Sequence, residues 1–417
     1  MGAALVSDKF VYAIGTMDTK GEELAFIAER LRRSGCLVKT VDVGTAASAQ
    51  VKPDVPRESV AACHNQGEEF VKKQQDRGAA VTAMAHALES YMLKEYDAGH
   101  VAAVIGAGGS GGTSLISRAM RALPIGLPKL LVSTVASGNT QPYIDCSDIT
   151  LMYSVVDVAG LNDVSRTILA NAANAISGMV EHYSSPALEK KSIGMTMFGV
   201  TTPCVDSVRG SLEESGNDCL VFHATGTGGR AMESLVASGY IDRVLDITTT
   251  EVADEVVGGV FPCGENRFES IISHMVPCVM SLGALDMVNF GAMETVPEKF
   301  RDRNLYVHNT EVTLMRTNVE ENIAIAEWLA NKINRTTAAF SLVISEGGVS
   351  MLDAPDQLFH DVEADQALFS TLEKLIEQNP KRRIIRSPHH INDREFADLL
   401  VRQLDQILEQ ESTPSVS

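Results

Sequence analysis

The sequence predicts an α/β protein of two similar halves, each a mainly parallel β-sheet flanked by helices. Three observations support this fold class. Apolar runs of strand length alternate with amphipathic helical patterns, which is typical of parallel sheets. The 417 residues suit two domains of ordinary size rather than one core. A glycine-rich loop lies between a strand and a helix in each half, at residues 106–112 and 224–229.

The first half opens with a strand–helix–strand unit, in which the helix crosses between two parallel strands. A helical insertion then separates the second strand from the third. We expect this domain to span residues 1–185 and to end in a linker at 184–186. Its expected strands lie at 10–14, 37–43, 100–105 and 129–134, and its helices at 20–34, about 57–96, from the glycine-rich loop to 123, and 163–182.

The second half, expected over residues 190–417, repeats this order of elements. The loop 109–112 corresponds to 226–229, and the next strand in each half ends in a hydroxyl-rich loop. Both gene duplication and convergence on a common strand-to-helix turn account for the match. The expected strands lie at 192–198, 219–223, 243–247, 339–344 and 382–386, and the later helices at 319–334, 365–378 and 393–409.

Composition and charge limit the classes of function. The formal net charge of −19 argues against nucleic acid as a partner, because phosphate backbones attract basic surfaces. The seven cysteines are scattered without a C-x-x-C pair, which indicates reduced thiols in the cytoplasm. No stretch before Phe10 looks like a signal peptide, and no apolar run is long enough to span a membrane. We therefore expect a cytoplasmic protein without a membrane partner.

The loops that follow the strands of the first half carry residue types suited to an anion. Carboxyl ends of parallel strands meet at one edge, where ligands of such sheets bind. Glycines allow close approach of the backbone, helix N-termini favour negative charge, and hydroxyls and a lysine add donors. The candidate cofactor-binding residues are Thr16, Asp18, Thr19, Lys20, Gly106, Gly108, Gly109, Ser110, Gly111, Gly112, Thr113, Ser133 and Thr134.

Two alternatives remain open at this edge. The glycines could serve only tight packing of helix on sheet, and Asp18 could cap the following helix or hold Mg²⁺ beside a triphosphate. The spacing G-x-G-x-x-G is present, but the next strand ends in Ser133-Thr134 without the acid of a dinucleotide site. No G-x-x-x-x-G-K-[ST] pattern occurs. The sequence therefore disfavours both a Rossmann dehydrogenase and a P-loop ATPase.

The second half concentrates reactive side chains at its own strand ends, which suggests the substrate side of an interdomain cleft. We expect substrate contacts from the glycine-rich loop and the following hydroxyl-rich loop. Adjacent histidines near the C-terminus could supply an acid/base pair, although neighbours in an extended segment point apart. The candidate substrate-binding residues are Thr225, Gly226, Thr227, Gly228, Gly229 and Thr249, and the candidate catalytic residues are Arg230, Glu251, His389 and His390.

Several of these segments together resemble a known family. Residues 12–23, with Gly15-Thr16-Met17-Asp18-Thr19-Lys20-Gly21 at their centre, are similar to the opening of the ATP-binding family typified by the tomato mosaic virus resistance protein. The motifs at 106–112, 198–203, 223–229 and 387–393 fit the same family, so the resemblance covers the whole chain. It implies two Rossmann-like domains, ATP and Mg²⁺ bound mainly by the first, a homodimer, and the stand-alone form without a further domain.

Three functions are compatible with these features. The first is an enzyme of small-molecule metabolism that binds Mg·ATP and acts on a small acid or sugar acid. The second is a non-catalytic module whose binding of a partner depends on a nucleotide. The third is an ATP-independent hydrolase or lyase whose glycine-rich loops hold an anionic substrate.

Overall fold

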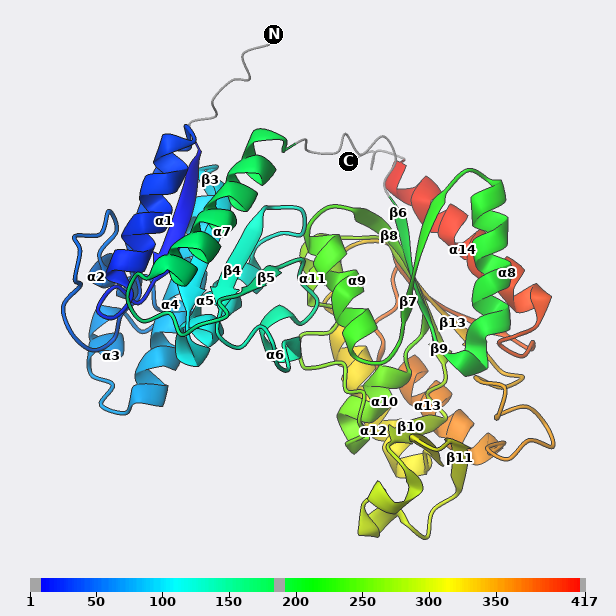
Figure 1. Cartoon of the computed structure of the whole chain (residues 1–417). Coiled ribbons are helices and arrows are strands. Elements are labelled where there is room, and N and C mark those ends of the chain that lie inside the picture. Colours follow the sequence, from blue (N-terminus) through cyan, green and yellow to red (C-terminus); the bar gives the residue numbers. More distant parts are fainter. Residues whose placement is uncertain (1–8, 184–191, 413–417) are drawn as a thin grey trace. The chain divides into compact units, whose positions relative to one another are not determined.

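The computed structural model describes residues 9–183 and 192–412, and the expected linker 184–186 lies outside them. The chain forms two compact units, Met1–Pro186 and Ala187–Ser417. Each unit contains a parallel sheet with helices on both faces (Figure 1). The predicted fold class is therefore confirmed.

The first unit has one five-stranded, fully parallel sheet in the order β2-β1-β3-β4-β5. Its elements are β1 (Phe10–Gly15), α1 (Gly21–Arg33), β2 (Val38–Asp42), α2 (Arg57–Ala61), α3 (Glu68–Lys72), α4 (Arg77–Asp97), β3 (Val101–Gly108), α5 (Ser110–Ala122), β4 (Lys129–Ser133), α6 (Gln141–Ile144), β5 (Thr150–Tyr153) and α7 (Asp163–Glu181).

Alternating side chains divide the core of this unit into two layers. In β1, Tyr12 and Ile14 pack with α4 and α5, whereas Val11 and Ala13 pack with α1 and α7 on the opposite face. Figure 1 shows α1 and α7 on the near side of the sheet. A capping box of Asn162 and Ser165 fixes the start of α7. Both faces are covered, as parallel sheets require.

The second unit has a six-stranded parallel sheet, β14-β13-β9-β8-β6-β7, and a separate antiparallel sheet, β10-β12-β11. Its elements are β6 (Ser192–Met197), η1 (Gly199–Thr201), α8 (Thr202–Glu214), β7 (Asp218–His223), α9 (Thr227–Ala237), β8 (Ile241–Thr248), α10 (Thr250–Val257), α11 (Glu269–Ser273), β9 (Cys278–Gly283), β10 (Met287–Phe290), η2 (Met293–Thr295), η3 (Glu298–Phe300), β11 (Leu305–Asn309), β12 (Val312–Arg316), α12 (Val319–Ile333), β13 (Phe340–Ser345), α13 (Val362–Leu375), β14 (Arg382–Ser387) and α14 (Arg394–Ser412).

The two parallel sheets share one order but not the loop correspondence that the sequence suggests. In both, the second strand lies outside the first, and the third lies on the first strand's other side. The loop 109–112 follows β3, the third strand of its sheet, whereas 226–229 follows β7, the second strand of the other. The predicted pairing of these loops is therefore wrong by one strand. The two loops have a similar local motif, but they follow strands at different positions in their sheets and are therefore not structurally equivalent.

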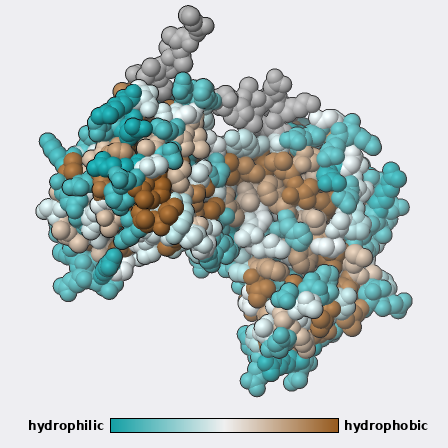
Figure 2. Space-filling model, viewed as in Figure 1, coloured by the Kyte–Doolittle hydropathy of each residue, from teal (hydrophilic) through white to brown (hydrophobic). Residues whose placement is uncertain are grey.

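Within the described residues, no helix is long and apolar enough to cross a membrane. Figure 2 shows hydrophilic side chains over most of the visible outer helices, with smaller hydrophobic patches on each unit. Such a surface agrees with the acidic composition and the net charge of −19.

Candidate functional site

The carboxyl ends of the first sheet meet at a topological switch point. The chain leaves β1 for β2 on one side and returns so that β3 lies on the other. Open parallel sheets bind their ligands in the crevice that this reversal creates. Ile14 pairs with Gly106 in the register of β1 and β3. The loops that begin after these strands, 16–20 and 109–112, therefore start from neighbouring strands.

Two glycines of the first loop serve packing. A Cβ on Gly106 would lie 2.9 Å from side-chain carbons of Ile116 and Leu131, where α5 and β4 press on β3. A Cβ on Gly108 would lie 3.0 Å from the Cα of Gly112. At such distances a Cβ would force the neighbouring atoms to shift. For these two positions, the packing alternative explains the glycine.

The remaining glycines of this loop face open space. A Cβ added to Gly111 or Gly112 would meet no atom within 4 Å, and one on Gly109 would meet only Oγ1 of Thr134, at 3.9 Å. Gly109 is the N-cap of α5, and no side chain in the described part of the chain caps this helix. The first-turn N–H groups, beginning at Ser110, are thus available to an external acceptor, and the helix dipole favours an anion there.

Two of the predicted hydroxyl residues bind each other instead. Thr113 and Ser133 are fully buried, and their hydroxyl oxygens lie 2.6 Å apart. This bond ties α5 to the end of β4 and so fixes the start of the helix. Thr134 lies one residue further, half-buried, with its backbone N–H donating to the carbonyl of Gly108 at 3.3 Å. Its hydroxyl is the one that reaches the open end of α5.

The loop after β1 brings a cation to the same edge. The hydroxyls of Thr16 and Thr19 lie 3.0 Å apart and close the loop on itself. The ammonium group of Lys20 donates to the carbonyl oxygen of Val158, in the segment that follows β5. Lys20 is therefore held by a neutral acceptor, which a ligand with a negative charge could replace.

Asp18 does not cap α1. The N-cap is Lys20, without a capping side chain, so the capping hypothesis is wrong. The loop turns the carboxylate toward the segment after β2, where Oδ2 accepts a hydrogen bond of 3.0 Å from the N–H of Ala46. Gly44 makes room for it, since a Cβ there would lie 2.7 Å from its carboxyl carbon. Asp18 thus joins two loops and is the carboxylate of the loop 16–20.

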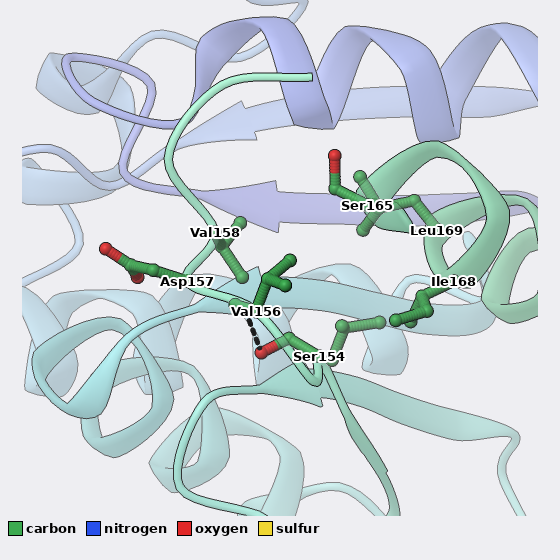
Figure 3. A pocket seen from close by; sticks show the side chains of 8 residues that line it. Ser154, Val156, Asp157, Val158, Ser165, Ile168 and Leu169 are labelled. Atoms are coloured by element: carbon green, nitrogen blue, oxygen red, sulfur yellow. Dashed lines mark hydrogen bonds between the residues drawn. The ribbon is translucent and has the colours of Figure 1, made fainter. Parts of the chain in front are cut away.

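The segment that accepts Lys20 lines a small cavity (Figure 3). Its volume of about 10 Å³ admits at most one water molecule. Ser154 donates to the carbonyl of Val156 at 2.7 Å, and the carboxylate of Asp157 points away from the cavity. The lining residues are Val132, Ser154, Val156, Asp157, Val158, Ser165, Ile168 and Leu169. This cavity is a packing gap rather than a ligand site.

The glycine-rich loop of the second unit is closed. A Cβ on Gly228 would lie 1.9 Å from the carbonyl oxygen of His223, and one on Gly229 1.9 Å from Oε1 of Glu251. The N–H of Gly226, the N-cap of α9, donates to Oε2 of Glu251 at 2.9 Å. The protein's own carboxylate therefore occupies the position that an anionic ligand would take at this helix.

The other predicted substrate-binding residues lie around this closed loop. The Thr225 hydroxyl lies 3.4 Å from both the carbonyl oxygen of His223 and the hydroxyl of Thr227. Thr249 is fully buried, and its hydroxyl donates to the carbonyl of Ser281 at 3.2 Å. Thr249 therefore ties β8 to β9 in the interior. The structure brings Thr225 and Thr227 together but keeps Thr249 away from the surface.

Glu251 belongs to a buried ion network around Arg267. The fully buried guanidinium donates to Glu251 at 2.6 Å, to Glu233 at 3.0 Å and to Asp246 at 2.5 Å. Burial raises the pKa of Glu251, and Arg267 opposes that rise. The predicted catalytic Arg230 lies at the start of α9, where it donates to the carbonyl of a proline in a neighbouring loop at 3.4 Å. The network holds α9, β8 and the loop before α11 together.

The two histidines near the C-terminus have different partners. In His390, Nε2 lies 2.8 Å from the carbonyl oxygen of Ser350, and Nδ1 accepts from the N–H of Asn392 at 3.0 Å. Both ring nitrogens of this neutral tautomer serve the backbone. His389 is 42% exposed, and its Nδ1 lies 4.0 Å from Oδ2 of Asp393. His389 alone remains open to solvent as an acid or base.

Sequence reasoning missed a second buried charge cluster. Nη2 of Arg316 lies 2.6 Å from Asp365 and 3.4 Å from Asp353, and Asp286 accepts from the hydroxyl of Ser350 at 2.7 Å. Burial raises the pKa of Asp353 to about 9 and that of Asp286 to about 6. No group of three His, Cys, Asp or Glu side chains in the described ranges is arranged to hold a metal. Only folding brings these acids together.

Comparison with known proteins identifies relatives over the whole length. The models for the N-terminal and C-terminal domains of the uncharacterised protein family UPF0261 match residues 9–185 and 190–408. A UPF0261 protein of Mesorhizobium japonicum is 50% identical over 397 residues, which cover 95% of this chain and 99% of the relative. A UPF0261 protein of Clostridium tetani is 46% identical and is covered completely.

A plant protein is also similar. The ToMV resistance protein Tm-1(GCR237) of Solanum lycopersicum is 46% identical over 422 residues, which cover 96% of this chain and 56% of the tomato protein. The predicted resemblance to the tomato mosaic virus resistance protein is therefore confirmed. This chain matches little more than half of the tomato protein.

Proposed function

The chain belongs to the UPF0261 family, and we propose that its first unit binds ATP with Mg²⁺ at the β1–β3 switch point. The observation that carries this proposal is the uncapped first turn of α5. No side chain of the described residues caps this turn, and a Cβ added to Gly111 or Gly112 would meet no atom within 4 Å. We further propose that the protein is an enzyme of small-molecule metabolism, which uses this nucleotide on a small acid.

The phosphate groups would bind to backbone and side-chain donors that are already in position. The N–H groups of α5 and the hydroxyl of Thr134 supply hydrogen bonds, and the helix dipole adds attraction. Lys20 would exchange its bond to the carbonyl of Val158 for a charge-assisted bond to a phosphate oxygen. Thr113 and Ser133 would act indirectly, because their hydrogen bond fixes the start of α5.

The residues of this edge also fit a magnesium ion. Mg²⁺ in nucleotide sites is bound by one or two carboxylates together with phosphate oxygens and water. Asp18 would hold it, since only its Oδ2 accepts a hydrogen bond from the described residues. When bound, the ion would neutralise phosphate charge. The position of Asp18 is set by the loop after β2, so the carboxylate is available without rearrangement of β1.

One observation favours a second candidate, a non-catalytic module whose partner binding depends on ATP. Of the predicted catalytic side chains, Glu251 is enclosed by Arg267 and the N–H of Gly226, and His390 binds the backbone through both ring nitrogens. A module of this kind would bind ATP without turnover. We propose a homodimer for either case, to be measured by light scattering.

Thermal unfolding with ATP, in the presence and absence of Mg²⁺, tests the proposal. A ligand at 100 times its dissociation constant stabilises the folded protein by about 2.7 kcal/mol. The G111E variant places a carboxylate in the first turn of α5, where a side chain at position 111 has space, and repels phosphate. G111Q has nearly the same shape without the charge and serves as the control.

We expect ATP to raise the melting temperatures of the wild type and G111Q. The affinity of G111E for ATP should be at least about tenfold lower, so ATP should raise its melting temperature less. ATP that does not shift the melting temperature of the wild type refutes the nucleotide proposal. Equal protection of G111E and G111Q moves the site away from α5. ATP hydrolysis assayed with a panel of small acids then separates the enzyme from the module, because only the enzyme turns over.

A further inference from the structure

A second cavity lies in the first unit, beneath the loop that follows β2. Its volume of about 320 Å³ is at the lower end of the range for ligand pockets, about 300–1,000 Å³. Residues 44–48 of this loop form one side, and the helices α2, α3 and α4 of the insertion form the other. The sequence predicts the insertion but indicates no role for it. A cavity of this size suits a small metabolite.

Arg57, the first residue of α2, lines this cavity and is held rigidly. Its Nε donates to Oδ2 of Asp42 at 2.8 Å. Asp42 is 2% exposed, and its Oδ1 accepts from the N–H groups of Met17 and Gly44 at 3.0 and 2.8 Å. The carboxylate at the end of β2 is therefore fully hydrogen-bonded and fixes the direction of the guanidinium.

The terminal nitrogens of Arg57 make no hydrogen bond to any described residue, and Nη2 is buried. A buried charged donor without an acceptor is costly, and such groups in folded proteins are normally satisfied by protein, water or ligand. The fork of a guanidinium matches a carboxylate in geometry and charge. Asp42 therefore satisfies only the Nε of Arg57, and its terminal nitrogens have no acceptor among the described residues.

The other residues that line the cavity indicate which further chemical groups the ligand has. Thr45, Ser48 and Gln74 bring hydroxyl and amide groups to the cavity. Lys72 also lines it but is paired with Glu68, and the exposed Glu58 lies at its margin. Small apolar residues complete the lining: Ala46, Ala47, Ala61, Val71, Ala80 and Met84. Such a wall fits a short carbon chain with a few oxygen atoms.

We infer that this cavity binds a short-chain hydroxy or oxo carboxylic acid, with its carboxylate on the guanidinium of Arg57. Ala46 lines the cavity and donates its N–H to Asp18, so the cavity adjoins the carboxylate offered above for Mg²⁺. The role of the acid as the substrate of the ATP-dependent reaction rests on the proposed function. Its binding does not, because Arg57 and the cavity are separate from α5.

Isothermal titration of the full chain with lactate, glycerate and pyruvate tests this inference, with lactamide as the uncharged analogue of lactate. R57Q removes the charge but leaves Asp42 without its ion pair, which could prevent folding. A80L reduces the volume of the cavity and keeps the ion pair of Arg57 with Asp42, since Ala80 is a buried lining residue of α4. A79L makes the same change at the exposed neighbouring residue and is the matched control.

We expect at least one of the acids to bind to the wild type and A79L, and lactamide not to bind. Loss of a charge-assisted carboxylate contact in R57Q lowers affinity by at least about tenfold, and A80L shows a similar loss. Acid binding should be equal in G111E and G111Q, which alter only the nucleotide site. ATP binding should be unchanged in A80L.

Three results overturn the inference: none of the acids binds, A80L binds them as the wild type does, or lactamide binds as well as lactate. Loss of ATP binding in A80L assigns the cavity to the nucleotide and also overturns it. Acid binding without ATP binding leaves the inference intact and refutes the proposed function. The two proposals can therefore fail separately.

Discussion

The buried acid Asp353 gives a sharp prediction of how stability depends on pH. Burial, opposed by Arg316, raises the pKa of Asp353 to about 9 in the folded protein, whereas an unfolded Asp titrates near 3.8. Between these values the folded state holds a proton that the unfolded state has released. The contribution of Asp353 to the free energy of unfolding therefore falls as pH rises, by about 1.4 kcal/mol per pH unit.

Comparison with D353N over the range from pH 7 to 8.5 isolates this residue from the other buried acids. Burial raises the pKa of Asp286 to about 6, so Asp286 has largely lost its proton above pH 7, and that of Asp254 to about 7, so Asp254 titrates in this range in both proteins alike. D353N carries an amide that cannot titrate. Over these 1.5 units we expect the wild type to lose about 2 kcal/mol of stability relative to D353N.

Urea unfolding at constant ionic strength measures this difference. The chain has one tryptophan, Trp328 in α12, which packs beside Phe268 in the second unit and so reports on the unit that contains Asp353. D356N makes the same change at an exposed position of the same loop, and its difference from the wild type should stay constant. If the free energies of unfolding of the wild type and D353N change equally with pH across this range, Asp353 is not protonated in the folded protein and the reasoning is wrong.

Four further outcomes follow from the contacts. G229A should lower the free energy of unfolding by about 3 kcal/mol or more, because its Cβ would meet Glu251. G112A should change it by less than about 1 kcal/mol, and calorimetry of both variants checks this. R267A leaves three buried carboxylates without a cation and should cost about 3–5 kcal/mol in Trp fluorescence melts. N162A removes the cap of α7 and should cost about 1 kcal/mol, seen as faster hydrogen exchange in its first turns. Calorimetric titration should give one ATP per chain, since the second glycine-rich loop is already occupied by a carboxylate.

The sequence was sufficient for the fold class and for the edge of the sheet that carries the candidate site. Long amphipathic helices such as 163–182, and strands followed by glycine-rich turns, have strong local patterns. The central strand β9 (Cys278–Gly283) was missed because all six of its residues are buried. A short, fully apolar strand has no period that separates it from a helix. The four-residue strands β5 and β10 were missed because so short a run carries too little pattern.

The roles of individual site residues depended on partners that are distant in the sequence. Gly106 and Gly111 are equivalent in the loop motif, yet one is packed against Leu131 and the other faces open space. Arg57 is defined by Asp42, fifteen residues earlier, and by a cavity whose walls come from three helices. Residue type predicts that this edge suits an anion. It could not predict which groups were already satisfied within the protein, because that depends on tertiary contacts.

The two units use the same strand order but treat the anion-binding potential of their helix N-termini differently. In the second unit, α10 follows the third strand as α5 does in the first, but its opening residues, Thr250 and Glu251, are fully buried. Glu251 then extends to the N-terminus of α9 and accepts a hydrogen bond from the N–H of Gly226 there. A helix N-terminus at the carboxyl edge of a sheet favours a negative charge, and in the second unit the side chain of Glu251 provides that charge. The first unit leaves the corresponding α5 open, which is why we assign the nucleotide to it.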